Sequence, residues 1–138
     1  MDIFSAILWL TLNIYHEARS EDQLSQIAVG HVVLNRSQKQ GRSVKRIVLA
    51  PYQFSWVHTK DWTPNDVPAL VESFQSACIA YKGFDFTGGS TYYHARKVNP
   101  YWAKKKALVA TFGAHKFYRD IKLIKALKVK RKFVVKRR

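Results

Sequence analysis

Glu17 is the side chain of this sequence best suited to acid–base chemistry. It ends a run in which apolar residues recur at helical spacing, namely Ile3, Phe4, Ile7, Leu8, Leu10, Ile14 and Tyr15. Burial in an apolar wall raises the pKa of a carboxyl group, so a glutamate at the end of such a helix can stay protonated near neutral pH. Acid catalysis on a glycosidic bond requires a protonated carboxyl of this kind. The alternative is a surface ion pair with Arg19 or another cation, which is the commoner situation of a glutamate.

The other residues with catalytic potential lack the partners that their chemistry needs. A zinc protease helix carries a second histidine four residues after the first, but Ser20 stands at that position after His16. Cys78 lies on the apolar side of a predicted helix, where a structural cysteine is expected, and as the single cysteine it excludes an internal disulfide. His31 lies on the apolar face of another predicted helix, which is typical of a core histidine. We therefore expect no metal and no cofactor.

Aromatic side chains are concentrated in segments without helical or strand periodicity. They are Tyr52, Phe54, Trp56, Trp62, Tyr92, Tyr93, Tyr101 and Trp102. Exposed aromatic rings suit the apolar faces of sugars, whereas a purely structural core would use aliphatic residues. The pattern indicates either a sugar-binding groove or the packing of loops, and it does not separate the two.

The elements that must position these residues are mainly helical. Apolar periodicity predicts helices over residues 2–18, 20–34, 43–50 and 66–82. Ser20, followed three residues later by Gln23, predicts the start of the second helix, and Asp66 or a neighbour predicts the start of the last. Gly83 is expected to close that last helix.

Less regular structure is predicted between and after these helices. Residues 51–68 mix proline, tryptophan and polar residues and predict an ordered loop. Residues 106–119 predict an antiparallel hairpin around Gly113. A chain of 138 residues, of which 47% are hydrophobic, has enough apolar surface for one domain. We expect an α+β fold, mainly α, over residues 1–120, followed by a tail.

Positive charge dominates the sequence, with 24 Lys and Arg against 9 Asp and Glu and a formal charge of +15. Such a charge predicts a polyanionic partner, and nucleic acid, anionic lipid and bacterial wall polymers all qualify. Nine of the cations fall in residues 121–138, interleaved with apolar residues. This pattern predicts either a basic amphipathic helix that binds a membrane or wall surface, or a solvated extension.

Several blocks of sequence follow one another in a characteristic order. They are Asn-Ile-Tyr-His-Glu-Ala-Arg at 13–19, Gln-Ile-Ala-Val-Gly-His-Val-Val-Leu-Asn-Arg at 26–36, and shorter blocks at 53–56, 93–95, 98–103 and 113–119. In these blocks the sequence resembles the SleB-type cell wall hydrolase family, named for spore-cortex lytic enzymes. The resemblance spans roughly residues 8–119 and does not cover the tail. An ordered series of this kind is far more specific than one short match.

The resemblance implies a lysozyme-like domain in which Glu17 is the catalytic acid acting on the glycan strands of peptidoglycan. It favours a lytic transglycosylase, which cleaves between N-acetylmuramic acid and N-acetylglucosamine and uses the muramic C6 hydroxyl as acceptor. A muramidase of the same fold would use water instead. An inverting hydrolase would also need a second carboxylate, for which Asp61, Asp66 and Asp85 are the candidates in loops.

Candidate substrate-binding residues come from the same aromatic and polar segments. They are Gln53, Ser55, Trp56, Tyr93, His94, Asn99 and Trp102. The polar members could hydrogen-bond the hydroxyl and acetamido groups of the sugars, or alternatively satisfy loop backbone. The sequence departs from the family pattern at His16, where an aromatic residue is usual, at Ser20, where glycine is usual, and at Tyr92, where histidine is common.

The biological setting that these features suggest is that of a phage endolysin. The opening run Met1–Leu12 carries Asp2 where an export signal has basic residues, and it is too short to span a bilayer, so it is expected to be a core helix. We expect a monomer made in the host cytoplasm that acts on peptidoglycan after release across the membrane. Its tail would attract anionic wall polymer, lipopolysaccharide or lipid. The rival classes are a nucleic-acid-binding module, whose usual motifs are absent, and a wall-binding protein that cleaves no bond.

Overall fold

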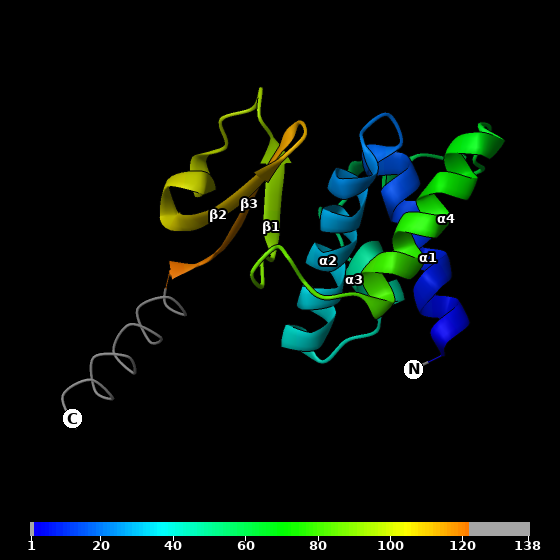
Figure 1. Ribbon diagram of the computed structural model, residues 1–138, viewed down its shortest axis with the longest axis horizontal. Helices are drawn as coiled ribbons and strands as arrows, with labels where there is room; N and C mark the ends of the chain where they lie inside the picture. Colours follow the sequence, from blue (N-terminus) through cyan, green and yellow to red (C-terminus); the bar gives the residue numbers. More distant parts are fainter. Residues whose placement is uncertain (1, 122–138) are drawn as a thin grey trace.

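The computed structural model describes residues 2–121, so the predicted basic tail lies outside the described residues apart from Ile121. The α-helices α1 to α4 come first along the chain and the strands follow them (Figure 1). The elements are α1 (Ile3–Ala18), α2 (Gln23–Gln40), α3 (Val44–Leu49), the 3-10 helix η1 (Ser55–His58), α4 (Val67–Lys82), β1 (Tyr92–Ala95), the 3-10 helix η2 (Tyr101–Lys105), β2 (Lys106–Phe112) and β3 (His115–Asp120). The prediction of a mainly helical α+β fold is confirmed.

Short polar side chains fix where the helices begin. The Asp22 carboxylate accepts a hydrogen bond of 2.9 Å from the Ser25 amide and caps α2. The prediction that Ser20 caps this helix is therefore wrong, because the Asp22 carboxylate satisfies a free amide of the first turn and places negative charge at the positive end of the helix. Asp66 caps α4 as predicted, accepting from the Ala69 amide at 3.1 Å.

Helix α2 packs against both α1 and α4, as its broadly apolar sequence predicts. Val29 and Val32 on α2 and Ile14 on α1 are fully buried. At Gly30 the backbones of α2 and α4 come close together, since a Cβ atom there would lie 2.9 Å from the Cβ of Ala80. Any larger residue at position 30 would force the two helices apart.

The predicted hairpin is confirmed, and it belongs to a larger sheet. Strands β2 and β3 pair antiparallel with a bulge between Leu108 and Ala110, and β1 joins on the other side of β3. The sequence did not predict β1 because the strand has only four residues within an aromatic, turn-rich segment. In this sheet Tyr93 lies opposite Phe117, which is fully buried against the helical core.

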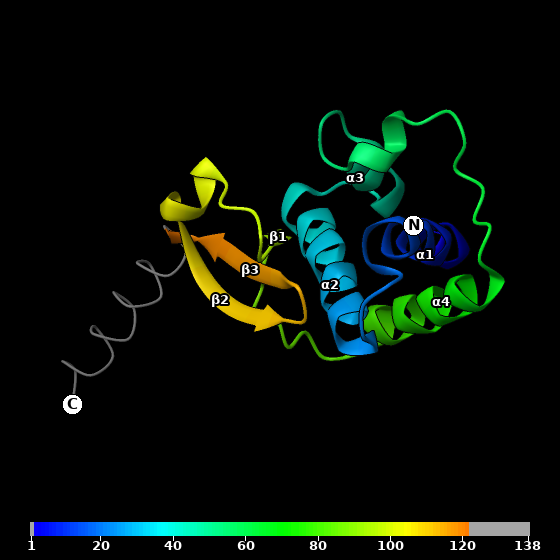
Figure 2. The same ribbon diagram turned by 90° about the horizontal axis from the view of Figure 1, so that it is seen from above.

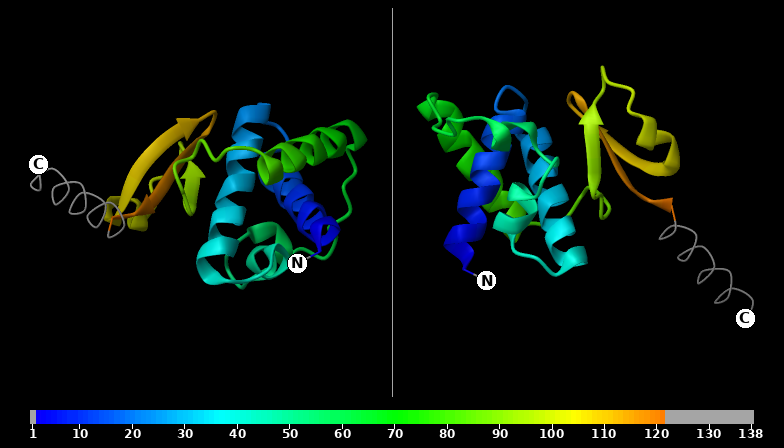
Figure 3. Two further views of the ribbon diagram at one scale, coloured as in Figure 1. Left: turned by 60° about the horizontal axis from the view of Figure 1, so that its bottom comes forward. Right: turned by 180° about the vertical axis from the view of Figure 1, so that it is seen from behind.

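The sheet stands beside α2, and α1 and α4 lie on the opposite side of that helix (Figures 1 and 2). The other two views show the same order of sheet, α2 and α1 (Figure 3). The turn between α1 and α2 contacts the β2–β3 turn through a hydrogen bond from the Ala114 amide to Glu21. The end of α1 therefore lies next to β1, whose Tyr93 contacts Glu17. Among residues 2–121, none of the helices combines the length and the hydropathy needed to cross a bilayer.

Candidate active site

Glu17 lies in the last turn of α1, and Tyr93 of strand β1 contacts it from the sheet. The Tyr93 hydroxyl donates a hydrogen bond of 2.7 Å to Glu17 Oε1. Burial raises the pKa of Glu17 above its ordinary value, while the Tyr93 hydrogen bond and the nearby His115 and Arg36 side chains partly oppose that rise. The result is a half-buried carboxyl that holds its proton to higher pH than a solvated glutamate does.

Tyr93 is fixed as a neutral hydrogen-bond donor. Burial and the neighbouring charge of Glu17 raise the Tyr93 pKa well above the usual value for a phenol. Its ring packs edge-on against His115, with centroids 5.2 Å apart, and at 5.7 Å from the ring of Phe117. The sequence singled out Tyr93 as a sugar-binding residue, and the structure places its hydroxyl on the acid itself.

A second acidic residue, Glu21, holds the sheet to the helices next to this pair. Its Oε2 lies 2.7 Å from His115 Nδ1, and its Oε1 accepts a hydrogen bond of 3.1 Å from the Ala114 amide. The adjacent Gly113 leaves no room for a side chain, because a Cβ atom there would collide with Ser25 Oγ. Sequence reasoning missed Glu21 and His115, since only the fold brings the α1–α2 turn to the β2–β3 turn.

On the helical side, His16 and Trp56 form a stacked pair beside Glu17. Their ring centroids are 4.4 Å apart with an interplanar angle of 16°. Trp56 is buried and donates a hydrogen bond of 2.9 Å from Nε1 to Asn13 Oδ1. His16 Nε2 lies 3.1 Å from the Trp62 carbonyl oxygen, which can only accept, so this nitrogen carries a proton. His16 thus stacks on Trp56 as an aromatic side chain would, and burial lowers its pKa, which favours the neutral ring.

Arg36, at the inner side of α2, is a further member of the site that sequence reasoning did not single out. Its Nε donates to the Thr91 carbonyl at 2.6 Å, and its Nη1 donates to Gln53 Oε1 at 3.3 Å. The guanidinium carbon lies 5.5 Å from the centre of the Phe54 ring and 5.8 Å from that of Tyr92. Gln53, a predicted binding residue, therefore accepts a hydrogen bond from an arginine whose charge lowers the Glu17 pKa.

The remaining predicted binding residues lie apart from the Glu17–Tyr93 pair. His94 and Trp102 belong to the opposite face of the sheet, where both rings contact Tyr118 at centroid distances of 5.2 and 5.4 Å. Ser55 and Asn99 are exposed, and their side chains make no hydrogen bond within the described part of the chain. Of the seven predicted residues, only Gln53, Trp56 and Tyr93 have contacts that lead to Glu17 or to its neighbours.

All nine carboxylate side chains of the sequence lie among the described residues. All of them except Glu17 cap a helix or turn, or bind a cation or side-chain amide. The caps are Asp2, Asp22, Asp61, Asp66 and Asp85, and the others are Glu21, Glu72 and Asp120. Asp61, Asp66 and Asp85, the predicted second carboxylates, are all occupied in this way, and none of them is among the groups that shift the Glu17 pKa.

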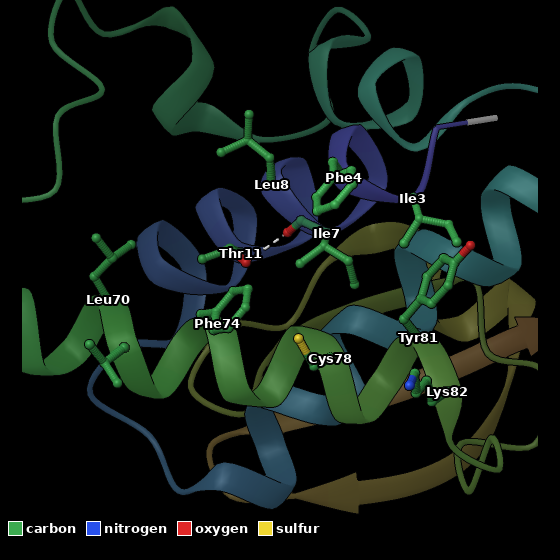
Figure 4. A pocket seen from close by; sticks show the side chains of 11 residues that line it. Ile3, Phe4, Ile7, Leu8, Thr11, Leu70, Phe74, Cys78, Tyr81 and Lys82 are labelled. Carbon is green, nitrogen blue, oxygen red and sulfur yellow. Dashed lines mark hydrogen bonds between the residues drawn. The ribbon is translucent and has the colours of Figure 1, made fainter.

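A separate apolar groove of about 640 Å³ runs between α1 and α4 (Figure 4). Phe4, Phe74 and Cys78 line it, and their positions on these helices lie away from the last turn of α1. Cys78 was expected to be a buried structural residue, but it is half-buried on the wall of this groove. Within residues 2–121, no three His, Cys, Asp or Glu side chains come together as potential metal ligands.

Comparison with known proteins gives matches to cell wall enzymes. A family model described as cell wall hydrolase matches residues 20–118, a range that begins just after Glu17. The catalytic domain of the germination-specific lytic transglycosylase SleB from Bacillus anthracis is 26% identical, with a TM-score of 0.71 over 83% of this chain and 93% of that one. The catalytic domain of the Bacillus cereus SleB protein is 25% identical, with a TM-score of 0.66 over 83% of this chain and 91% of that one. No curated protein sequence matches.

Proposed function

The chain belongs to the cell wall hydrolase family, and on that premise we propose that it cleaves the glycan strand of peptidoglycan with Glu17 as general acid and base. The observation that carries the proposal is the state of Glu17. Among the nine side-chain carboxyls, all of them described, it alone neither caps a helix or turn nor binds a cation or side-chain amide, and burial raises its pKa. Similarity to SleB catalytic domains, one of them described as a lytic transglycosylase, supports the same class of substrate.

In the first step Glu17 protonates the bridging oxygen between N-acetylmuramic acid and N-acetylglucosamine. Tyr93 occupies Oε1, so the proton leaves from the other oxygen, Oε2. The C1–O bond breaks, and positive charge develops on the muramic ring. The Tyr93 hydroxyl and the positive charge of Arg36 stabilise the carboxylate that remains.

In the second step the same carboxylate takes the proton of the muramic C6 hydroxyl as O6 bonds to C1. The product is a 1,6-anhydro sugar, and Glu17 is returned to its protonated form. This route needs a single carboxyl group, whereas hydrolysis by inversion needs a second one to activate water. The structural roles of the other carboxylates in this chain support the transglycosylase. The phage endolysin setting, with release of the enzyme across the host membrane, stays a prediction.

Mass spectrometry of the fragments released from purified peptidoglycan tests the proposal. The wild-type protein should release fragments with 1,6-anhydromuramic ends, and Glu17→Gln should release none. Asp61→Asn is a matched control, because it removes the charge of an exposed carboxylate outside the site. Reducing muramic ends would make the enzyme a muramidase instead, and no fragments from folded wild-type protein would favour a wall-binding or nucleic-acid-binding role.

A further inference from the structure

A basic pocket of about 340 Å³ lies beside the Glu17 site. Its wall is formed by the end of α2, the loop after α3 and the beginning of β1. Arg36, Lys39 and Arg42 supply its positive charge, and Gln53 and Tyr92 supply polar and aromatic surface. No acidic residue lines it.

The turn that follows α2 brings the cations into this pocket. The helix ends at Gly41, whose left-handed backbone with φ of 64° allows the chain to turn sharply. The Arg42 amide then bonds back to the Ser37 carbonyl at 3.2 Å, which fixes the backbone of Arg42 against the last turn of the helix. Lys39 and Arg42 therefore lie on either side of one short turn.

The charge of this pocket is only partly neutralised by the protein. Lys39 binds Asp120, which Lys106 also binds. Arg36 and Arg42 form no salt bridge with any of the nine side-chain carboxylates, all of which lie in the described part of the chain. Arg36 is half-buried, so leaving its charge without an anionic partner carries a free-energy cost that a bound anion would remove.

The position of the pocket relates it to the reacting sugar. Arg36 donates a hydrogen bond of 2.6 Å to the Thr91 carbonyl, directly before β1, and Tyr93 of the same strand donates to Glu17 at 2.7 Å. In peptidoglycan the peptide stem is joined to the lactyl group of N-acetylmuramic acid, the sugar whose C1 reacts under the proposed function. The stem of that sugar therefore begins close to the acid, and its free carboxylates come within reach of a neighbouring pocket.

We propose that this pocket, formed by Arg36, Lys39, Arg42, Gln53 and Tyr92, binds a carboxylate of the peptide stem on the muramic acid at the cleavage site. The assignment rests on the proposed function, because Glu17 defines which sugar lies beside the pocket. Arg36 provides a planar set of N–H donors suited to a carboxylate, and Arg42 provides a second charge at the solvent side. The pocket would therefore favour binding of glycan strands whose peptide stems carry free carboxylates.

Binding measured by calorimetry tests this assignment without depending on cleavage. The ligand is a soluble disaccharide–peptide fragment of peptidoglycan, used either as the free acid or with its stem carboxylates converted to primary amides. The protein carries Glu17→Gln, so that no bond is broken during the titration. We expect the acid to bind about tenfold more tightly than the amide, as charge-assisted hydrogen bonds to a half-buried arginine predict.

Two further variants locate the effect. Adding Arg42→Gln should reduce the preference for the acid to about twofold or less, whereas Arg46→Gln, which removes an exposed charge outside the pocket, should leave it unchanged. Equal affinity for acid and amide, or equal effects of the two arginine variants, would overturn the assignment. Tighter binding of a glycerol phosphate oligomer, lost in Arg42→Gln, would also overturn it and make a wall phosphate the ligand.

The same proteins separate this proposal from the proposed function. If the fragment assay gives no cleavage by the protein with Glu17 intact but the acid preference persists and needs Arg42, the enzyme proposal fails and the anion pocket stands. If cleavage occurs and amidation of the stems changes neither KM nor affinity, the pocket proposal fails and the enzyme stands.

Discussion

The helices and the sheet contribute to the Glu17 site in different ways. On the helical side, Glu17 is supported by buried packing, with His16 stacked on Trp56 and Trp56 bonded to Asn13. On the sheet side, contact with the carboxyl is made by one hydroxyl, that of Tyr93. The helices therefore determine where the carboxyl lies, and the sheet adjusts its proton affinity. Variants on the two sides should separate these two roles.

The largest effect is expected from removing the carboxyl itself. Glu17→Gln should lower the rate of glycan cleavage by roughly 10³-fold or more, because one group acts as both acid and base.

The same variant should gain stability relative to the wild type as pH rises. Burial raises the Glu17 pKa above its unfolded value, so the wild type loses free energy of unfolding as pH rises through the folded pKa. The variant has no proton to lose there, so its Tm should fall less than that of the wild type between pH 4 and pH 7.

The attachment of the sheet to the helices is the next largest expected effect. Phe117→Ala should lower the free energy of unfolding by about 3–5 kcal/mol, because it leaves a cavity where the sheet meets the helical core. Leu108→Ala, on the exposed side of the same sheet, should change it by about 0.5 kcal/mol or less. Denaturant unfolding followed by circular dichroism measures both. Equal effects would mean that the sheet gains no stability from its contact with the helices.

A smaller effect, on pH dependence, is expected from Tyr93→Phe. Losing the hydroxyl should lower kcat about tenfold through poorer positioning of the carboxyl. The Tyr93 hydrogen bond lowers the Glu17 pKa, so its removal raises that pKa. Because the acid must be protonated, the fall of activity at high pH should shift to still higher pH. Tyr101→Phe, at an exposed tyrosine of η2, is the control, and a matching shift in that variant would contradict a specific role for Tyr93.

The smallest effect is expected on the far face of the sheet. Trp102 contacts Tyr92, His94 and Tyr118 and has no described contact with Glu17 or Tyr93. Trp102→Ala should therefore change KM for peptidoglycan less than about twofold. A tenfold rise in KM with unchanged stability would instead show that the glycan strand runs over this face, as the sequence-based prediction of Trp102 and His94 implied.

The sequence predicted those features that depend on local periodicity. The spacing of apolar residues in α1 placed Glu17 at the end of a helix, and Gly113 marked the hairpin turn. The helix was predicted to be buried, but Ile3, Phe4 and Leu8 in its first half are exposed. The roles of Tyr93, Glu21 and His115 could not be predicted, because they depend on contacts between segments far apart in the chain. Trp56 was predicted to bind sugar because it lies in a segment without helical or strand periodicity. In the structure the 3-10 helix η1 turns its ring inward toward Asn13. Alternation in β1 likewise assigns Tyr93 and His94 to opposite faces, although they are adjacent in sequence.

The close contact at Gly113 also decides where the chain could accept an added segment. The β2–β3 turn is seated on α2 through Ser25 and is bonded to Glu21, so an insertion there would separate the sheet from the helices. Residues 97–99 are exposed and lie between β1 and η2 without such a contact. A fused binding module or a fluorescent tag is therefore better accommodated at 97–99 than at the hairpin tip, even though both are surface turns.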